Sequence, residues 1–464
     1  MRKKEKKRAS GSLTEGVIWK QLLLFALPLL GSSFIQQLYN TVDLLFAGNL
    51  IGKNATAAVG ASSLVITCMI GFFTGLSVGT GVVVSQAVGA KDEKKTDRLI
   101  HTSMGLSLLG GAFLSAAGIP LTRTLLIFMD TPPEILNSAV SYMQIYLLSM
   151  IPLVTYNMLS GVIRACGDSR APMVIQLAGG IVNVAMDYIS IRFLHMGVQG
   201  VAWATMFSQG AAAVLCVCYL MRPAAPYRLE WRRVRIHRDL LAAVLKVGVP
   251  AGFQSMVITL SNLFVQYKIN GLGVEAVAAF SVYFKVELLI YLPIVAFGQA
   301  MTTFAGQNVG AGKPERVRGG VKTSMLMGVG YAFFSAFLLL FFGETVFAWF
   351  NRDPDVIACG LRVIRVTFPF YWLYVILEVL ADTLRGSGKS VQPMCIILLN
   401  LCVIRTVLLA VFSRIWGNLE AVAAVYPAAW FLASACFVLY WFRCSDFMGA
   451  CGFYTPDRSE NLSQ

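Results

Sequence analysis

The feature that most limits how this chain can fold is a series of twelve apolar segments, each long enough to cross a lipid bilayer. A transmembrane helix needs about 20 predominantly apolar residues, and runs bounded by charged residues, glycine or proline are typical of such helices. The two longest segments exceed this need, so their helices are expected to tilt, bend or protrude. The approximate limits of the twelve segments are 17–40, 57–88, 98–118, 136–163, 171–192, 198–221, 241–270, 275–308, 318–342, 357–384, 391–413 and 419–442.

The composition excludes a water-soluble protein. Hydrophobic residues make up 57% of the chain, charged residues 13%, and the mean hydropathy is +0.68, whereas soluble domains carry about 25% charged residues. The net charge of +14 could suggest nucleic acid, but the basic residues lie in loops, where they set membrane orientation. The chain is therefore expected to contact membrane lipid and no nucleic acid. Three scattered histidines provide no metal or nucleophile cluster, so we expect neither an enzyme nor a cofactor.

Lysine and arginine are distributed unequally between the two sides of the series. With the N-terminus inside, 26 lie in cytoplasmic segments and 7 on the opposite side. The positive-inside rule therefore predicts two cytoplasmic termini. The first segment lacks a signal-peptide cleavage site, so we expect it to stay in the mature protein. The predicted organisation is a basic leader at 1–15, a six-helix lobe at 16–221, a basic linker at 222–240, a second six-helix lobe at 241–443 and a cytoplasmic tail at 444–464.

Polar loop motifs recur at a constant spacing. QAVGA at 86–90 matches QNVGA at 307–311, and RACGDSRAPM at 164–173 matches RGSGKSVQPM at 385–394, both 221 positions later. Pro28 pairs with Pro250, one residue out of this register. Because each half has an even number of spans, both halves should point the same way and be related by an axis along the membrane normal.

These motifs also carry a family resemblance. QQLYNTVDLLFAGNLIG at 36–52, QAVGAKDEKK at 86–95, RACGDSRAPM at 164–173, GVQGVAWAT at 197–205 and QNVGAGKPERV at 307–317 resemble signatures of the multidrug and toxic compound extrusion (MATE) transporters. The resemblance runs from about residue 15 to 445. It implies two six-helix lobes around a V-shaped central cleft. It also implies export of organic, often cationic, compounds driven by inward H⁺ or Na⁺.

Ionisable residues inside the spans are candidate functional sites, because each costs at least a few kcal/mol in the membrane. Gln36, Tyr39, Asn40 and Asp43 follow i, i+3, i+4, i+7 spacing, which places them on one helix face. That polar face should look into a cavity, unless Asp43 is a solvated helix end.

Span 5 and span 6 carry further polar groups of this kind. Asn183 and Asp187 repeat the pattern at i, i+4, and Thr205 adds a hydroxyl. Together with Asp43 they form an all-oxygen set that suits a hard cation or a shared proton. The resemblance to the DinF-like branch of the family assigns cation coupling to Asp43, Asn183, Asp187 and Thr205, through the motifs YNTVD, NVAMD and AWAT.

The second lobe is less clear. Glu287 and Glu378 form a candidate second-lobe site, because the other main branch of the resembled family binds its cation in this lobe. Glu378, the repeat partner of Asn157, could equally belong to a buried ion pair that fixes structure. Lys285 and Glu287 are two residues apart and should point to different sides. The structural interpretation is favoured for two further basic residues, Lys268 and Arg405.

The predicted function is antiport by alternating access. Two carboxylates in low dielectric disfavour double ionisation, so a charged Asp43/Asp187 pair would accept an amphipathic cation and a neutralised pair would release it. Gln36, Tyr39, Asn40 and Asn157 would line the substrate cleft. Either H⁺ or Na⁺ could couple, and the protein is expected to act as a monomer in a bacterial inner membrane. A lipid-linked saccharide flippase of the same superfamily is the alternative, although it should have a cleft richer in Arg and Lys.

Overall fold

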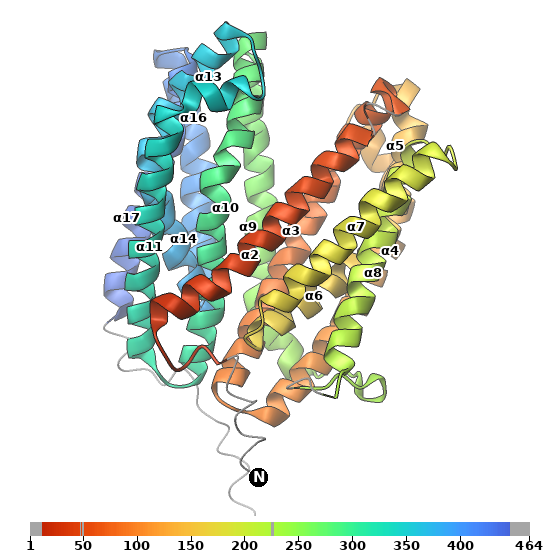
Figure 1. Ribbon diagram of the computed structural model, residues 1–464, viewed down its shortest axis with the longest axis vertical. Helices are drawn as coiled ribbons and strands as arrows, with labels where there is room; N and C mark the ends of the chain where they lie inside the picture. The colour runs from red at the N-terminus through yellow and green to blue at the C-terminus, as the bar shows by residue number, and fades with distance from the viewer. Residues whose placement is uncertain (1–11, 47, 49–50, 224–226, 446–464) are drawn as a thin grey trace, which may run out of the picture. The chain divides into compact units, whose positions relative to one another are not determined.

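The computed structural model describes residues 12–46, 48, 51–223 and 227–445, and every regular element among them is a helix. The helices of each unit run along its length (Figure 1). Their bounds are α2 Ile18–Phe46, α3 Lys53–Gly89, α4 Glu93–Phe128, α5 Pro133–Leu148, α6 Met150–Ala165, α7 Arg170–Arg192, α8 Val198–Met221, η2 Trp231–Arg233, α9 Arg238–Asn270, α10 Val274–Gly310, α11 Pro314–Phe341, α12 Gly343–Ala348, α13 Pro354–Thr367, η3 Phe368–Phe370, α14 Tyr371–Gly386, α15 Val391–Ile397, η4 Leu398–Ile404, α16 Arg405–Ile415 and α17 Leu419–Ser445.

The predicted set of spans is confirmed. Among the described residues, 11 helices are long and apolar enough to cross a membrane, and the bent pair α5–α6 brings the number to 12. The largest difference from a predicted limit is at the end of the third span, because α4 continues beyond 118 and through Pro120 to Phe128. An interior proline is tolerated in a membrane helix where neighbouring helices and side chains satisfy the freed backbone groups.

Two spans are broken at repeat-related places. The α5 and α6 helices meet at Ser149 with a bend of 42°. In the second half, the 3₁₀ turn η3 at Phe368–Phe370 separates α13 from α14. Phe370 lies 221 positions after Ser149, the shift of the loop motifs, so the two halves share this irregularity as well as their sequence motifs.

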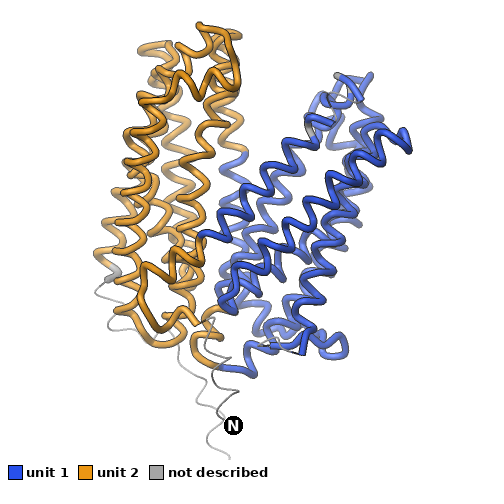
Figure 2. Tube along the Cα trace, in the orientation of Figure 1, with its two compact units in different colours: residues 1–11, 27–84, 92–259 blue, residues 12–26, 85–91, 260–464 orange. Residues whose placement is uncertain are grey.

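The described chain forms two compact units (Figure 2). Unit 1 comprises residues 27–84 and 92–259 of the described chain, and unit 2 comprises 12–26, 85–91 and 260–445. Three of the boundaries fall inside α2, α3 and α9, and the one at 91/92 falls in the loop between α3 and α4. The predicted lobe limits at 16–221 and 241–443 stay a prediction, as does the cleft between the lobes.

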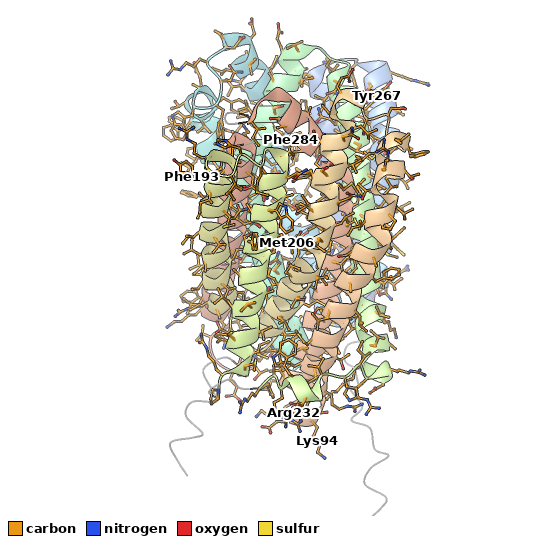
Figure 3. The ribbon with its side chains drawn as sticks, turned by 90° about the vertical axis from the view of Figure 1, so that its right-hand side faces the viewer. Lys94, Phe193, Met206, Arg232, Tyr267 and Phe284 are labelled. Atoms are coloured by element: carbon orange, nitrogen blue, oxygen red, sulfur yellow. The ribbon has the colours of Figure 1, made fainter. Side chains whose placement is uncertain are left out.

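Unit 1 has one end that is rich in basic residues. Figure 3 shows Lys94 and Arg232 at this end, Phe193 toward the opposite end and Met206 between them. The part of the linker that follows residue 226 packs against α4 here: the amide of Glu230 donates to His101 Nε2 at 3.1 Å, and an ion pair of 3.2 Å joins Arg98 to Asp239. The described part of the basic linker is thus held against the bundle.

Within unit 2, the two copies of the QxVGA motif cross where α3 and α10 end. A Cβ added to Gly89 would lie 1.9 Å from the carbonyl oxygen of Gln307, and one added to Gly310 would lie 2.0 Å from that of Gln86. Each glycine packs against the glutamine of the other copy, so the contact is reciprocal. This is the geometry expected of two repeats related by a twofold axis. It requires glycine because the backbones touch.

Candidate functional site

The candidate site of unit 1 forms where α2 packs against α7. Glycines allow the close approach: a Cβ on Gly31 would lie 2.8 Å from the Sδ of Met173, and one on Gly180 would lie 3.5 Å from the ring of Tyr39. Gly179 meets α8 at Ser208 on the neighbouring side. Small residues commonly let membrane helices approach in this way, and here they place α7 between α2 and α8.

Three of the predicted side chains converge at this contact. The carboxyl group of Asp43 lies close to that of Asp187 and to the amide of Asn183. Asn183 is 1% exposed and Asp187 0%. Asp43 Oδ1, both polar atoms of Asn183 and both carboxyl oxygens of Asp187 are buried without a hydrogen-bond partner.

So many unpartnered atoms in one place require an explanation. A buried polar atom without a partner costs about 1–3 kcal/mol, more if it is charged, and such atoms are rare in native proteins. Here they belong to two carboxyls and one amide. This set offers the oxygen ligands that Na⁺ requires, or two carboxylates that can share a proton. The residues therefore fit either coupling ion.

A shell of uncharged polar groups extends the site along α2. Tyr39 is 8% exposed, and its hydroxyl accepts a hydrogen bond of 3.2 Å from Gln176 Nε2. The Tyr39 hydroxyl also lies near Asp43, Gln36 and Gln209. Gln36, Tyr39 and Asp43 thus form one connected polar region, as their spacing predicted.

Sequence reasoning missed two tyrosines of α5. Tyr142 is 6% exposed and lies within electrostatic reach of both Asp43 and Asp187, and Tyr146 stacks obliquely on it with ring centroids 6.0 Å apart. The signal was their i, i+4 spacing on a helix face that turns inward. Tyr142 also belongs to an apolar cluster with Ile66, Ile191, Val201 and Ala202. Tyr142 thus links the carboxyl pair to an apolar cluster, and apolar surroundings lower the local dielectric and strengthen electrostatic interactions.

We predict that Tyr142→Phe weakens the apparent affinity for the coupling ion. Loss of a hydroxyl within electrostatic reach of the carboxyl pair should raise the half-saturating ion concentration about threefold to tenfold, an effect similar in size to the loss of one hydrogen bond. Ion titration of transport in proteoliposomes measures this value. Tyr188→Phe is the matched control, since Tyr188 on α7 is 48% exposed. Equal effects of both substitutions would contradict a role for the Tyr142 hydroxyl.

The remaining predicted residues of the first lobe are placed less directly. Contacts of Gly179 with Ser208 and of Gly200 with Ser190 fix the antiparallel register of α7 and α8, which puts the buried Thr205 level with Asn183. Its hydroxyl donates to the carbonyl of Val201 at 3.1 Å.

Two of the predicted cleft residues are not brought to the carboxyl pair by any recorded contact among the described residues. Asn40 is exposed on α2. Asn157 is half-buried on α6, where its amide donates to the carbonyl of Leu153 at 3.0 Å. A role for either residue in the cleft stays a prediction.

The carboxyl groups of the second lobe differ because they have partners. Glu287 on α10 accepts hydrogen bonds from Tyr283 at 3.1 Å and from Tyr371. Lys285 points elsewhere, with its ammonium 5.8 Å from the Phe350 ring, so the prediction that these neighbours diverge is confirmed.

Glu378 lies in an ionic cluster on α14. It lies beside Asp382, Arg385 and the hydroxyl of Tyr374, and Arg385 forms an ion pair with Asp382. A Cβ on Gly298 would lie 2.6 Å from the Asp382 carboxyl, so α10 packs directly on this cluster. No second-lobe carboxylate among the described residues has a buried oxygen without a partner. The geometry therefore favours the structural interpretation of Glu378.

A bundle of membrane-spanning helices with a buried, partly unsatisfied polar site defines a class, the multi-pass membrane transporters. The MatE family model matches residues 28–189 and, a second time, residues 250–411. The chain therefore belongs to the MatE family and is a MATE-type transporter, not an enzyme. The second match begins and ends 222 positions after the first, which confirms the predicted internal repeat.

Relatives and a solved structure agree with this assignment. The chain is 28% identical over 432 residues to the probable multidrug resistance protein YpnP of Bacillus subtilis, covering 92% of this chain and 96% of the relative. It is 27% identical over 389 residues to the probable multidrug resistance protein NorM of Thermotoga maritima, covering 83% of each. An outward-facing multidrug resistance MATE family transporter of the MOP superfamily has the same fold, with a TM-score of 0.89, 21% identity and coverage of 96% and 99%.

Proposed function

We propose that this protein is a secondary antiporter that exports amphipathic organic cations in exchange for inward H⁺ or Na⁺. The observation that carries the proposal is the pair of carboxyl groups of Asp43 and Asp187. This pair lies next to Asn183, and its buried oxygens have no hydrogen-bond partner. The multidrug resistance names of the relatives support the substrate class.

The carboxyl pair gives a simple coupling rule. When both carboxyls are charged and free of the coupling ion, they repel each other and attract a cationic substrate. Binding of H⁺ or Na⁺ lowers the negative charge of the pair and weakens that attraction. Each elementary charge that crosses the membrane potential delivers about 2.3 kcal/mol per 100 mV. Because Pro28 lies within α2, we propose that this helix repacks near Pro28 as the charge changes.

The proposal also assigns an orientation and a branch. Both termini face the cytoplasm of a bacterial cell membrane, because the basic residues gather in the segments on that side. The coupling residues Asp43, Asn183, Asp187 and Thr205 all lie in unit 1, as the DinF-like branch implies. The protein acts as a monomer.

Dye efflux from proteoliposomes tests the function. Vesicles loaded with a fluorescent organic cation receive either a pH gradient without Na⁺ or a Na⁺ gradient at equal pH. Efflux that follows one gradient and stops when it is dissipated identifies the coupling ion. Efflux that neither gradient accelerates would contradict antiport.

For the second lobe we predict a small effect of Glu378→Gln. Glu378 already has partners, so its neutralisation should change gradient-driven efflux by no more than about fivefold, the value of roughly one neutral hydrogen bond. The same efflux assay measures this change. If Glu378→Gln abolished gradient dependence while Asp187→Asn preserved it, the coupling site would belong to the second lobe.

A further inference from the structure

A buried arginine lies inside unit 2 at a π-helical turn. α15, η4 and α16 form one span, and Arg405 is the first residue after the π-helix Leu398–Ile404. Its side chain is 6% exposed. Nη2 donates to Ser261 Oγ at 2.7 Å and to Asn262 Oδ1 at 2.9 Å, both on α9. Its Nε is buried without a partner.

This arginine has no counter-ion within the described part of unit 2. Its recorded hydrogen bonds go to neutral groups, and the Tyr426 ring lies 6.0 Å from the guanidinium. Glu287 is bonded instead by Tyr283 and Tyr371. A buried charge without an opposite charge is costly. Only neutral contacts offset that cost here, so structure alone does not account for Arg405.

The repeat shows what this position corresponds to. The offset is 221 where α7 and α15 begin, and 222 where the two family matches end, beyond the π-helix. A π-helix holds more residues per turn than an α-helix, which accounts for the one-residue change. With the offset of 222, Arg405 corresponds to Asn183, and Ser261 and Asn262 correspond to Tyr39 and Asn40.

The acidic positions of unit 1 have apolar counterparts. By the same offset Asp43 corresponds to Val265 and Asp187 to Leu409, which are 3% and 2% exposed. The second repeat has thus lost both carboxylates and gained a guanidinium at the equivalent place. Its charge is the opposite of that in the first repeat.

We propose that Arg405, Ser261 and Asn262 form an anion subsite, which takes the carboxylate of an organic acid or zwitterion. This inference rests on the proposed function and extends its substrates from cations to zwitterionic compounds. The Nε and Nη2 edge of a guanidinium matches the two oxygens of a carboxylate. Here Nε is unpartnered, and Nη2 is held by Asn262, whose side chain is exposed. A carboxylate that displaces the Asn262 amide can accept one hydrogen bond from Nε and one from Nη2 of Arg405.

Two dyes that differ only in this group test the subsite. Rhodamine B carries a free carboxylate and is zwitterionic at neutral pH, whereas its ethyl ester is a cation with the same rings. Binding of each dye to the purified full-length protein in nanodiscs is measured by fluorescence anisotropy. Arg405→Gln should raise the Kd for rhodamine B about tenfold or more, the value of hydrogen bonds to a charged group, and leave the ester within about twofold.

Two further variants separate binding from structure. Arg405→Lys keeps the positive charge but loses the paired N–H donors of the guanidinium. It should therefore bind rhodamine B more weakly than wild type and more tightly than Arg405→Gln. Arg414→Gln on the same helix removes an exposed arginine and should change neither dye. The subsite is refuted if Arg405→Gln weakens both dyes alike, if it changes neither, or if wild type does not bind rhodamine B.

Failure of the proposed function would look different. If the protein binds rhodamine B through Arg405 but exports neither dye along an ion gradient, the subsite is supported and the antiport mechanism is refuted. If the protein exports the ester along a gradient but its binding of rhodamine B does not depend on Arg405, antiport is supported and the subsite is refuted.

Discussion

Asp187→Asn is expected to abolish gradient-driven efflux and leave the protein folded. The amide has the shape of the carboxyl but cannot take up a proton or supply the charge that holds Na⁺. Because Asp187 is fully buried beside Asp43, no solvent group can replace it. Efflux in proteoliposomes with an imposed gradient should fall about 100-fold, near the upper end of usual coupling energies between sites.

The matched control is Asp130→Asn, the same change at an exposed loop position. Asp130 has φ 53°, a left-handed conformation that asparagine adopts readily, so both fold and efflux should be unaffected. Asp187→Asn should melt at or above the wild-type temperature, since it removes repulsion between two buried carboxyls. Normal gradient-driven efflux by Asp187→Asn would refute the assignment of the site.

Sequence spacing grouped the residues of the acidic site within each helix. The helical period fixes which residues share a face, so Tyr39 and Asp43, or Asn183 and Asp187, could be paired without coordinates. That α2 meets α7 follows from Gly31 and Gly180, which the sequence marks only as small residues. Tyr142 was missed because a tyrosine near a span end is equally typical of a membrane interface.

The second lobe could not be interpreted from the sequence for a different reason. Whether Glu287 and Glu378 are free or partnered depends on tyrosines and an arginine from other helices, and no spacing rule predicts those contacts. The π-helix before Arg405 shifts the repeat register by one residue, so a constant offset of 221 compares Arg405 with Val184 instead of Asn183. The sequence therefore indicated a purely structural role for Arg405, because its correspondence to Asn183 was hidden.

The crossing of the two QxVGA motifs leads to the second large expected effect: Gly89→Val should prevent unit 2 from folding. A Cβ at Gly89 would lie 1.9 Å from the Gln307 carbonyl oxygen, and that oxygen belongs to backbone that cannot rotate away. The helices must separate, which should cost about 3 kcal/mol or more, the upper range for overpacked sites. Size-exclusion profiles and melting temperatures of detergent-solubilised protein measure the loss.

Gly60→Val on the same helix is the control, because a Cβ at Gly60 meets nothing within 4 Å. It should behave as wild type. Gly310→Val must be as damaging as Gly89→Val, since its Cβ would lie 2.0 Å from the carbonyl oxygen of Gln86 in the reciprocal contact. If Gly89→Val were tolerated as well as Gly60→Val, the two motifs would not touch, and the contact between the repeats within unit 2 would be wrong. Damage by Gly89→Val but not by Gly310→Val would keep the contact and contradict its twofold relation.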